Sequence, residues 1–207
     1  MTRTKRGRRW IEQHVRDPYV RQARAEGLRS RAAYKLQQIA SRDRLFRPGM
    51  TVVDLGAAPG GWSQVAARAV APGGRVYAVD LLDIAPLAGV SALRGDVQDK
   101  AVQAMLEAAL GEHCVDLVLS DMAPNISGVA AADEARVMAL AELAQMFALK
   151  HLKPQGKLLV KVFHGAGFEA YRAALRQNFR EVAVRKPQAS RSRSSEVYLL
   201  AQGLRAR

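Results

Sequence analysis

The chain has 207 residues, 49% of them hydrophobic, and a formal net charge of +13 at pH 7. This size and apolar content predict one domain with a full core, and the charge indicates a polyanion or an anionic membrane surface as partner. The single cysteine, Cys114, excludes a disulfide framework and a cysteine-based zinc site. It precedes an apolar run and is expected to be buried. The four scattered histidines show no ligand spacing, so no metal is expected.

No apolar run approaches the roughly 20 residues of a membrane helix. The basic N-terminus has no apolar stretch behind it, which excludes a secretory signal. Together these features predict a cytoplasmic protein.

The N-terminal segment is strongly basic and carries interleaved aromatic residues. Residues 1–29 are interpreted as a basic arm, mobile at its very start, and residues 30–207 as the folded domain. Ser30 is the expected N-cap of an amphipathic helix over residues 31–40.

From residue 51 onward, apolar strands alternate with helices. Strands are expected over residues 51–55, 75–79, 91–93, 115–119, 157–162, 181–184 and 196–201, and helices over 62–69, 100–109, 132–150 and 168–177. Apolar strands separated by helices predict a parallel sheet covered on both faces. The last two strands have no helix between them and are expected to be antiparallel to each other.

The most informative stretch covers residues 51–62 and reads TVVDLGAAPGGW. A strand that ends in glycines before a helix leaves backbone N–H groups facing a crevice that suits a nucleotide-like ligand. The spacing Asp54-x-Gly56-x-x-x-Gly60 is not the G-x-G-x-x-G of a dinucleotide site, which disfavours a dehydrogenase. It is the spacing found in S-adenosylmethionine (SAM) methyltransferases.

Acidic residues follow the next two strands. Asp80 ends the second strand and could accept hydrogen bonds from both ribose hydroxyls of a nucleoside, and Asp96 could accept from an adenine amino group. Trp62 starts the helix after the glycine turn and could pack on a ligand at the crevice mouth. An isolated aspartate is more often a helix cap or a solvated charge, but acids that occur together at successive strand ends indicate a ligand site.

Lys161 follows a hydrophobic run at the end of the fifth strand. Burying an ammonium group costs several kcal/mol unless it is paired or neutralised. The alternative is a strand-end lysine whose amine reaches water. Asp121 follows the fourth strand.

The sequence resembles the FtsJ-type heat-shock methyltransferases, bacterial enzymes that methylate a uridine ribose 2′-hydroxyl in large-subunit ribosomal RNA. The matching segments are residues 30–36, 54–64, 120–128, 156–163 and 186–198, and the resemblance runs from about Tyr19 to Gly203. It implies a Rossmann-like SAM-dependent methyltransferase fold, with a seven-stranded, mostly parallel sheet, one antiparallel strand near its edge and helices on both faces.

The resemblance also implies site residues. The family's Lys-Asp-Lys-Glu tetrad matches Lys35, Asp121, Lys161 and Glu196. Its SAM contacts match Gly60, Trp62, Asp80, Asp96 and Asp121, and Gly56 belongs to the same cofactor-binding turn.

The proposed chemistry needs a base, because a ribose 2′-hydroxyl is a poor nucleophile while protonated. Lys161 is the predicted base and must be uncharged to act. Asp121 is expected to orient Lys161 and the SAM amino group. Lys35 would contact RNA or hold the hydroxyl in line, and Glu196 would position Lys35 or accept from the substrate ribose.

The basic N-terminal segment and a loop carrying Arg185, Lys186, Arg191 and Arg193 are expected to flank the crevice mouth and contact phosphates. With 6% aromatic residues, recognition by shape and backbone is favoured over extensive base stacking. The expected partner is ribosomal RNA or the large ribosomal subunit, bound by a monomer.

Three alternatives stay open. The same reaction could act on transfer RNA or another RNA. An adenine-amino methyltransferase is disfavoured because Asp121-Met-Ala-Pro124 lacks the second proline and the aromatic residue of that motif. A basic ribosome-assembly factor without catalysis is disfavoured because all four tetrad positions are filled.

Overall fold

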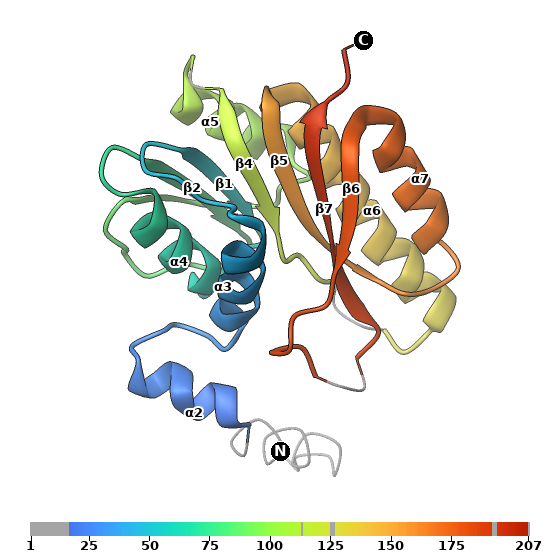
Figure 1. Ribbon diagram of the computed structural model, residues 1–207, viewed down its shortest axis with the longest axis horizontal. Helices are drawn as coiled ribbons and strands as arrows, with labels where there is room; N and C mark the ends of the chain where they lie inside the picture. Colours follow the sequence, from blue (N-terminus) through green and yellow to red (C-terminus); the bar gives the residue numbers. More distant parts are fainter. Residues whose placement is uncertain (1–16, 113, 125–126, 192–193, 207) are drawn as a thin grey trace.

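The computed structural model describes residues 17–112, 114–124, 127–191 and 194–206. In these residues seven strands form one sheet in the order β3-β2-β1-β4-β5-β7-β6 (Figure 1). The strands are β1 Thr51–Leu55, β2 Arg75–Asp80, β3 Val90–Arg94, β4 Val115–Ser120, β5 Leu152–Phe163, β6 Phe179–Arg185 and β7 Glu196–Leu204.

Helices cover both faces of the sheet, and the first helix of the described residues lies beyond its carboxyl edge (Figure 1). They are α2 Pro18–Ala25, α3 Ala32–Asp43, α4 Gly61–Val70, α5 Lys100–Leu110, α6 Ala130–His151 and α7 Phe168–Asn178. Apolar side chains of α5, α6 and α7 form one core with the sheet. Those of α3 and α4 form a second core on the opposite face.

The predicted fold class is confirmed. Strands β1 to β5 pair in parallel, whereas β7 is antiparallel to both β5 and β6. The carboxyl ends of the five parallel strands therefore meet at one edge of the sheet, at the bottom of Figure 1. The central strands carry near-continuous apolar runs because helices bury both of their faces.

Two local expectations need correction. Helix α3 begins at Ala32, its N-cap position is Arg31, and no side chain caps it. Ser30 instead packs against Gly61 of α4, where a Cβ atom would collide with its hydroxyl. Cys114 is exposed rather than buried, because it lies just before β4 begins.

The predicted basic arm contains a helix that was not foreseen, α2. Asp17 caps it by accepting a hydrogen bond from the backbone N–H of Tyr19, and Pro18 occupies its first turn. An acidic N-cap followed by proline is a helix-start signal that the sequence did contain. The start of the arm, predicted to be mobile, lies outside the described residues.

Candidate active site

A crevice of about 640 Å³ opens at the carboxyl edge of the parallel strands. Its lining comes from the segments at the ends of β1, β2, β3 and β4, and α6 provides one wall. The residues from the strand ends are Gly56, Ala58, Asp80, Leu81, Leu82, residues 95–98 and residues 121–124. Doubly wound sheets bind nucleotide-like ligands at this place.

Asp80 and Asp96 both line the crevice. Asp80 accepts hydrogen bonds from the backbone N–H groups of Ala58 and Leu82, each at 2.9 Å. Asp96 accepts one from the backbone N–H of Gln98 at 2.9 Å. A carboxylate offers about four acceptor positions. The backbone donors therefore fix both carboxylates and leave them able to accept from a ligand.

Gly56 forms part of the crevice floor and has a φ of +77°. A Cβ atom at this position would collide with the side chain of Met122. Both the backbone conformation and the available space therefore require glycine here. Gly60 is the N-cap of α4, with a φ of +100°, and lies against Arg29 rather than among the crevice residues.

The ring of Trp62 does not reach the crevice mouth, so the expectation that it packs on a ligand there is wrong. The residue is 3% exposed, and its indole N–H donates to the carbonyl of Ala32 at 2.8 Å. Its ring lies on Tyr198, with 5.5 Å between the centroids. Trp62 can offer a cofactor only its backbone, in the first turn of α4, where N–H groups lack acceptors within the helix.

The two lysines of the tetrad each form an ion pair. Lys161 Nζ in β5 lies 3.2 Å from Asp121 Oδ1, and it also donates to the backbone carbonyl of Asp121 at 2.5 Å. The Lys161 side chain is 7% exposed, which excludes the alternative of an amine in water. Lys35 Nζ in α3 lies 2.7 Å from Glu196 Oε1 at the start of β7.

Tyr198 joins the two ion pairs, a role that the sequence analysis missed. Its hydroxyl lies 3.0 Å from Asp121 Oδ1 and 3.3 Å from Glu196 Oε1. It stands directly opposite Lys161 in the β5–β7 register, and Lys35 Nζ lies 5.8 Å from its ring centroid. A signal was available, because Tyr198 is two residues after Glu196 on one strand and therefore shares its face.

The surroundings of Tyr198 and Glu196 determine the protonation states of these two side chains. Burial raises the pKa of Tyr198 well above its usual value, and the Asp121 and Glu196 carboxylates raise it further, so the phenol stays a donor. Burial also raises the pKa of Glu196, but the charges of Lys35 and Lys161 and the hydrogen bonds from Lys35 and Ser190 outweigh it. The pKa of Glu196 is therefore lowered, and its carboxylate is ionised.

Asp54 lies behind the crevice, at the end of β1, and is fully buried. It accepts a hydrogen bond from the Ser63 hydroxyl of α4 at 2.6 Å, while Oδ1 has no partner among the described residues. Burial, reinforced by the charges of Asp121 and Asp80 and opposed by the Ser63 hydrogen bond, raises the pKa of Asp54 to about 7.

Two cations of the predicted phosphate-binding loop have partners within the protein. Arg185 forms a two-point ion pair with Asp43, at 2.5 and 2.7 Å. Lys186 donates to the backbone carbonyls of Ser194 and Glu196. Both cations therefore hold the loop in place, whereas Arg191 is exposed and Arg193 lies outside the described residues.

Within the described ranges, no group of three or more histidine, cysteine, aspartate and glutamate side chains is arranged to hold a metal ion. Nor is any helix there both long and apolar enough to cross a membrane.

Comparisons with known proteins cover most of the chain. The model of the FtsJ-like methyltransferase family matches residues 28–204, which include the whole tetrad and the crevice. Ribosomal RNA large subunit methyltransferase E of Stenotrophomonas maltophilia (strain K279a) is 57% identical over 205 residues, covering 99% of this chain and 98% of the relative. The protein of that name from Xanthomonas oryzae pv. oryzae (strain PXO99A) is 56% identical over 204 residues, covering 99% and 97%.

Among solved structures, a Plasmodium falciparum protein described as a ribosomal RNA methyltransferase superposes with a TM-score of 0.78. The match covers 86% of this chain and 100% of that one at 24% identity, a likeness of fold. The family match over most of the chain and the identity to the bacterial relatives decide the assignment. The chain is a methyltransferase and belongs to the FtsJ-like methyltransferase family.

Proposed function

We propose that this protein transfers a methyl group from SAM to the 2′-hydroxyl of a uridine ribose in large-subunit ribosomal RNA, with Lys161 as the general base. The observation that carries the proposal is the buried Lys161–Asp121 pair beside a crevice with acidic groups at its strand ends. The class of RNA is inferred from the relatives, which are named ribosomal RNA large subunit methyltransferases.

The residues of the crevice fit SAM. Its volume of about 640 Å³ falls within the range of small-molecule sites. Asp80 would accept from the ribose hydroxyls, Asp96 from the adenine amino group and Asp121 from the ligand's ammonium group. When bound, SAM supplies a methyl group that its sulfonium charge already activates.

Lys161 takes the proton from the ribose oxygen during attack. Its amine must be uncharged at that moment, and two contacts to Asp121 hold the nitrogen in one place. Asp121 is thus a positioning group for the base as well as a ligand for the cofactor. Fixed placement of the base contributes to the rate because the reacting atoms must stand nearly in line.

Lys35 and Glu196 form the second half of the site. Of the two roles open to Glu196, its contact with Lys35 at 2.7 Å supports positioning of that lysine. Lys35 then presents a fixed ammonium group to the substrate, where it can hold the attacking hydroxyl or a neighbouring phosphate. Tyr198 keeps the two halves in register through its shared hydroxyl.

A hollow of about 340 Å³ continues from the crevice and offers a place for the substrate base. It shares Ala123 and Pro124 with the crevice and reaches Phe163, two residues beyond Lys161. Its size and its apolar wall suit a single pyrimidine turned out of the RNA stack.

The test is methyl transfer from labelled SAM to free ribosomal RNA and to isolated large subunits, followed by digestion and mass spectrometry. A methyl group on the ribose of a uridine supports the proposal. A methyl group on a base, or transfer to transfer RNA alone, contradicts it.

A further inference from the structure

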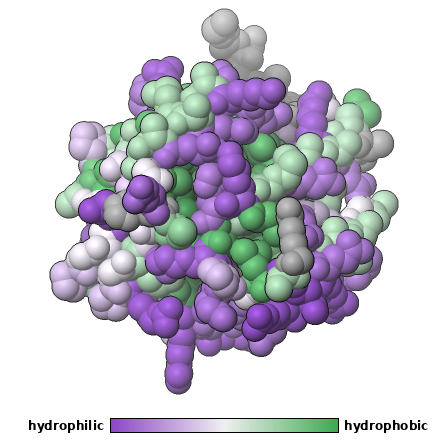
Figure 2. Space-filling model, turned by 90° about the horizontal axis from the view of Figure 1, so that it is seen from above, coloured by the Kyte–Doolittle hydropathy of each residue, from purple (hydrophilic) through white to green (hydrophobic). Residues whose placement is uncertain are grey.

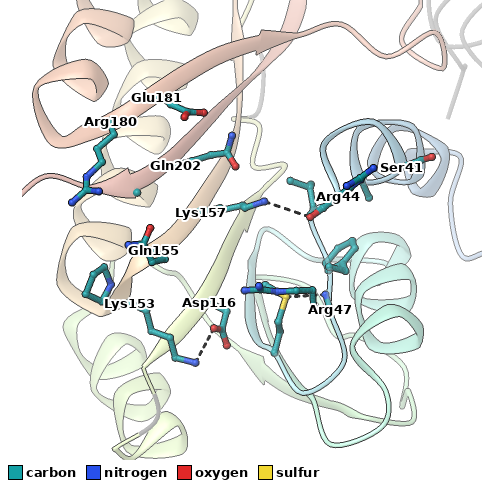
Figure 3. Close-up of a pocket in the computed structure, with 17 residues that line it drawn as sticks. Ser41, Arg44, Arg47, Asp116, Lys153, Gln155, Lys157, Arg180, Glu181 and Gln202 are labelled. Atoms are coloured by element: carbon teal, nitrogen blue, oxygen red, sulfur yellow. Dashed lines mark hydrogen bonds and ion pairs between the residues drawn. The ribbon is translucent and has the colours of Figure 1, made fainter.

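A second, larger cavity of about 1310 Å³ lies at the opposite edge of the sheet from the active site. Its walls are the turn between α3 and β1, the starts of β4, β5 and β6, and the end of β7 (Figure 3). Figure 2 shows the molecule from above, so the face in view is the one where β5 begins and β7 ends in Figure 1. Hydrophilic side chains cover much of this face. We call this cavity the distal pocket.

The lining of the distal pocket has more cations than carboxylates. The charged lining residues are Arg44, Arg47, Lys153, Lys157, Arg180, Asp116 and Glu181. Lys153 pairs with Asp116 at 2.7 Å, and the second oxygen of Asp116 accepts from the backbone N–H of Thr51. Both carboxylate oxygens of Asp116 are thus engaged, and neither pairs with another lining cation.

The remaining cations of the distal pocket differ from Lys153 in their partners. Among the described residues, no carboxylate forms an ion pair with Arg44, Arg47, Lys157 or Arg180. Lys157 Nζ donates only to the backbone carbonyl of Arg44, at 3.4 Å. In Figure 3, Arg47 and Lys157 extend from opposite walls into the same space.

This arrangement favours a bound anion on physical grounds. Burial and the charge of Arg47 lower the pKa of Lys157, against the opposing effects of Asp43 and Glu181. Burial and the neighbouring arginine together outweigh the two carboxylates, so the charged form of Lys157 is destabilised in the free protein. A cleft lined by one sign of charge concentrates the potential and attracts the opposite charge.

We propose that the distal pocket binds backbone phosphates of the RNA substrate, as a second contact remote from the active site. This inference rests on the proposed function, because it takes RNA as the polyanion. Strand β4 has six residues, which corresponds to about 20 Å at the usual rise per residue. An RNA that reaches both edges must pass around the protein, so the substrate is a long, folded RNA rather than a short single strand.

The test compares two double variants that remove the same amount of charge. Arg47→Gln with Lys157→Gln removes the two cations that extend into the distal pocket. Arg68→Gln with Lys100→Gln is the matched control, because these exposed residues lie outside both the crevice and the distal pocket. Thermal unfolding and SAM binding of both variants verify that each is folded.

The readout is the affinity for folded large-subunit RNA across a salt series. Loss of two phosphate contacts should reduce the slope of log affinity against log salt by about 1.4–1.8 and weaken binding roughly 15- to 30-fold at 0.15 M salt. The control pair should keep the wild-type slope. A short oligonucleotide carrying the target uridine should bind wild type and distal variant equally, and kcat at saturating RNA should be unchanged.

The inference is overturned if the distal variant matches the control on folded RNA, or if it loses equal affinity for the short oligonucleotide. Calorimetry with inorganic phosphate tests a second occupant. If the wild type binds phosphate, the distal variant does not, and the salt slope for RNA is unchanged, the pocket binds a small phosphate compound and the RNA proposal is contradicted. In each case wild-type methylation of RNA leaves the proposed function standing. If the wild-type protein neither binds nor methylates RNA, both the proposed function and the proposed distal contact are contradicted.

Discussion

The two edges of the sheet use the same residue types in opposite ways. At the active-site edge, Lys35 and Lys161 are buried, each is paired with a carboxylate, and Tyr198 joins the pairs. At the distal edge, Arg47 and Lys157 share a wide cavity without ion pairs to the described residues. Pairing and burial fix a nitrogen in one position, as chemistry requires. Unpaired cations in an open cavity suit a ligand whose position varies.

Energetics support this division. Moving a charged pair out of water costs several kcal/mol, and hydrophobic residues of similar volume often stabilise a fold as well or better. The buried pairs at the active-site edge are therefore better explained by the reaction than by stability. Variants at each edge test this difference.

The largest effect is expected for Lys161→Met, which keeps an unbranched side chain, one atom shorter, and removes the amine. Without a general base, kcat should fall roughly 100- to 10,000-fold. The dissociation constant for SAM should change little, because Lys161 is not among the crevice residues. Single-turnover methyl transfer and calorimetry measure the two quantities.

Lys157→Met is the matched control, four residues earlier on the same strand and at the other edge. It should leave kcat on a short RNA unchanged. Substantial turnover by Lys161→Met would remove Lys161 from the role of base.

The next effect concerns stability at the active-site edge. The pKa of Asp54 is raised from 3.8 to about 7 in the folded state, so between these values the folded protein holds a proton that the unfolded chain releases. The free energy of unfolding should therefore decrease as pH rises through this window, by about 1.4 kcal/mol per pH unit and about 4 kcal/mol in total. Below pH 3.8 and above about pH 7 this contribution should be flat.

Urea unfolding of wild type and Asp54→Asn between pH 5 and 8 measures this contribution, because the difference between the two curves isolates Asp54. The asparagine keeps the shape of the side chain and cannot ionise. A difference that stays constant with pH would show that Asp54 is ionised throughout.

A smaller effect is expected for the cofactor. Asp80→Asn removes the charge of a crevice carboxylate that backbone N–H groups hold in place. Hydrogen bonds to a charged group contribute about 1.5–3 kcal/mol, so SAM affinity should fall roughly 10- to 100-fold. Asp83→Asn is the control, since Asp83 is exposed and pairs with Arg94. Equal SAM affinity in the two variants, measured by calorimetry, would exclude Asp80 from the cofactor site.

Local sequence patterns predict the elements of this fold and the edge at which the acids gather. Each strand and helix is encoded within one continuous segment of at most 22 residues, and parallel strands bring Asp80, Asp96 and Asp121 to one edge. Contacts between residues far apart in the sequence cannot be predicted from such local patterns. The pairing of Arg185 with Asp43 joins residues 142 positions apart, and no local pattern indicates that a carboxylate engages this arginine.

The same limit applies to aromatic residues at the active site. Trp62 follows the glycine turn in the sequence, which suggests a place beside the crevice. In the structure, α3 supplies the acceptor for its indole N–H, and its ring packs against Tyr198. The distal pocket could not be predicted either, since five separate elements contribute its walls.

The smallest expected effect tests whether the two halves of the active site act together. Tyr198→Phe keeps the ring against Trp62 and removes the hydroxyl shared by Asp121 and Glu196. A hydrogen bond to a charged group at the lower end of its usual range corresponds to about tenfold, so kcat should fall roughly tenfold with KM for RNA unchanged. Without that donor, Asp121 stabilises the ammonium form of Lys161 more strongly. The rising limb of the pH–rate profile should therefore move to higher pH.

Tyr171→Phe separates this role from simple loss of a buried hydrogen bond. Tyr171 is also buried, and its hydroxyl donates to the backbone carbonyl of Ala141 at 2.8 Å in the core on the other face of the sheet. Both substitutions should destabilise the fold by about 1 kcal/mol, but only Tyr198→Phe should alter kcat and the pH profile. If the two variants have equal kcat, the two ion pairs work as independent units, and each lysine is held in place by its own carboxylate and by burial.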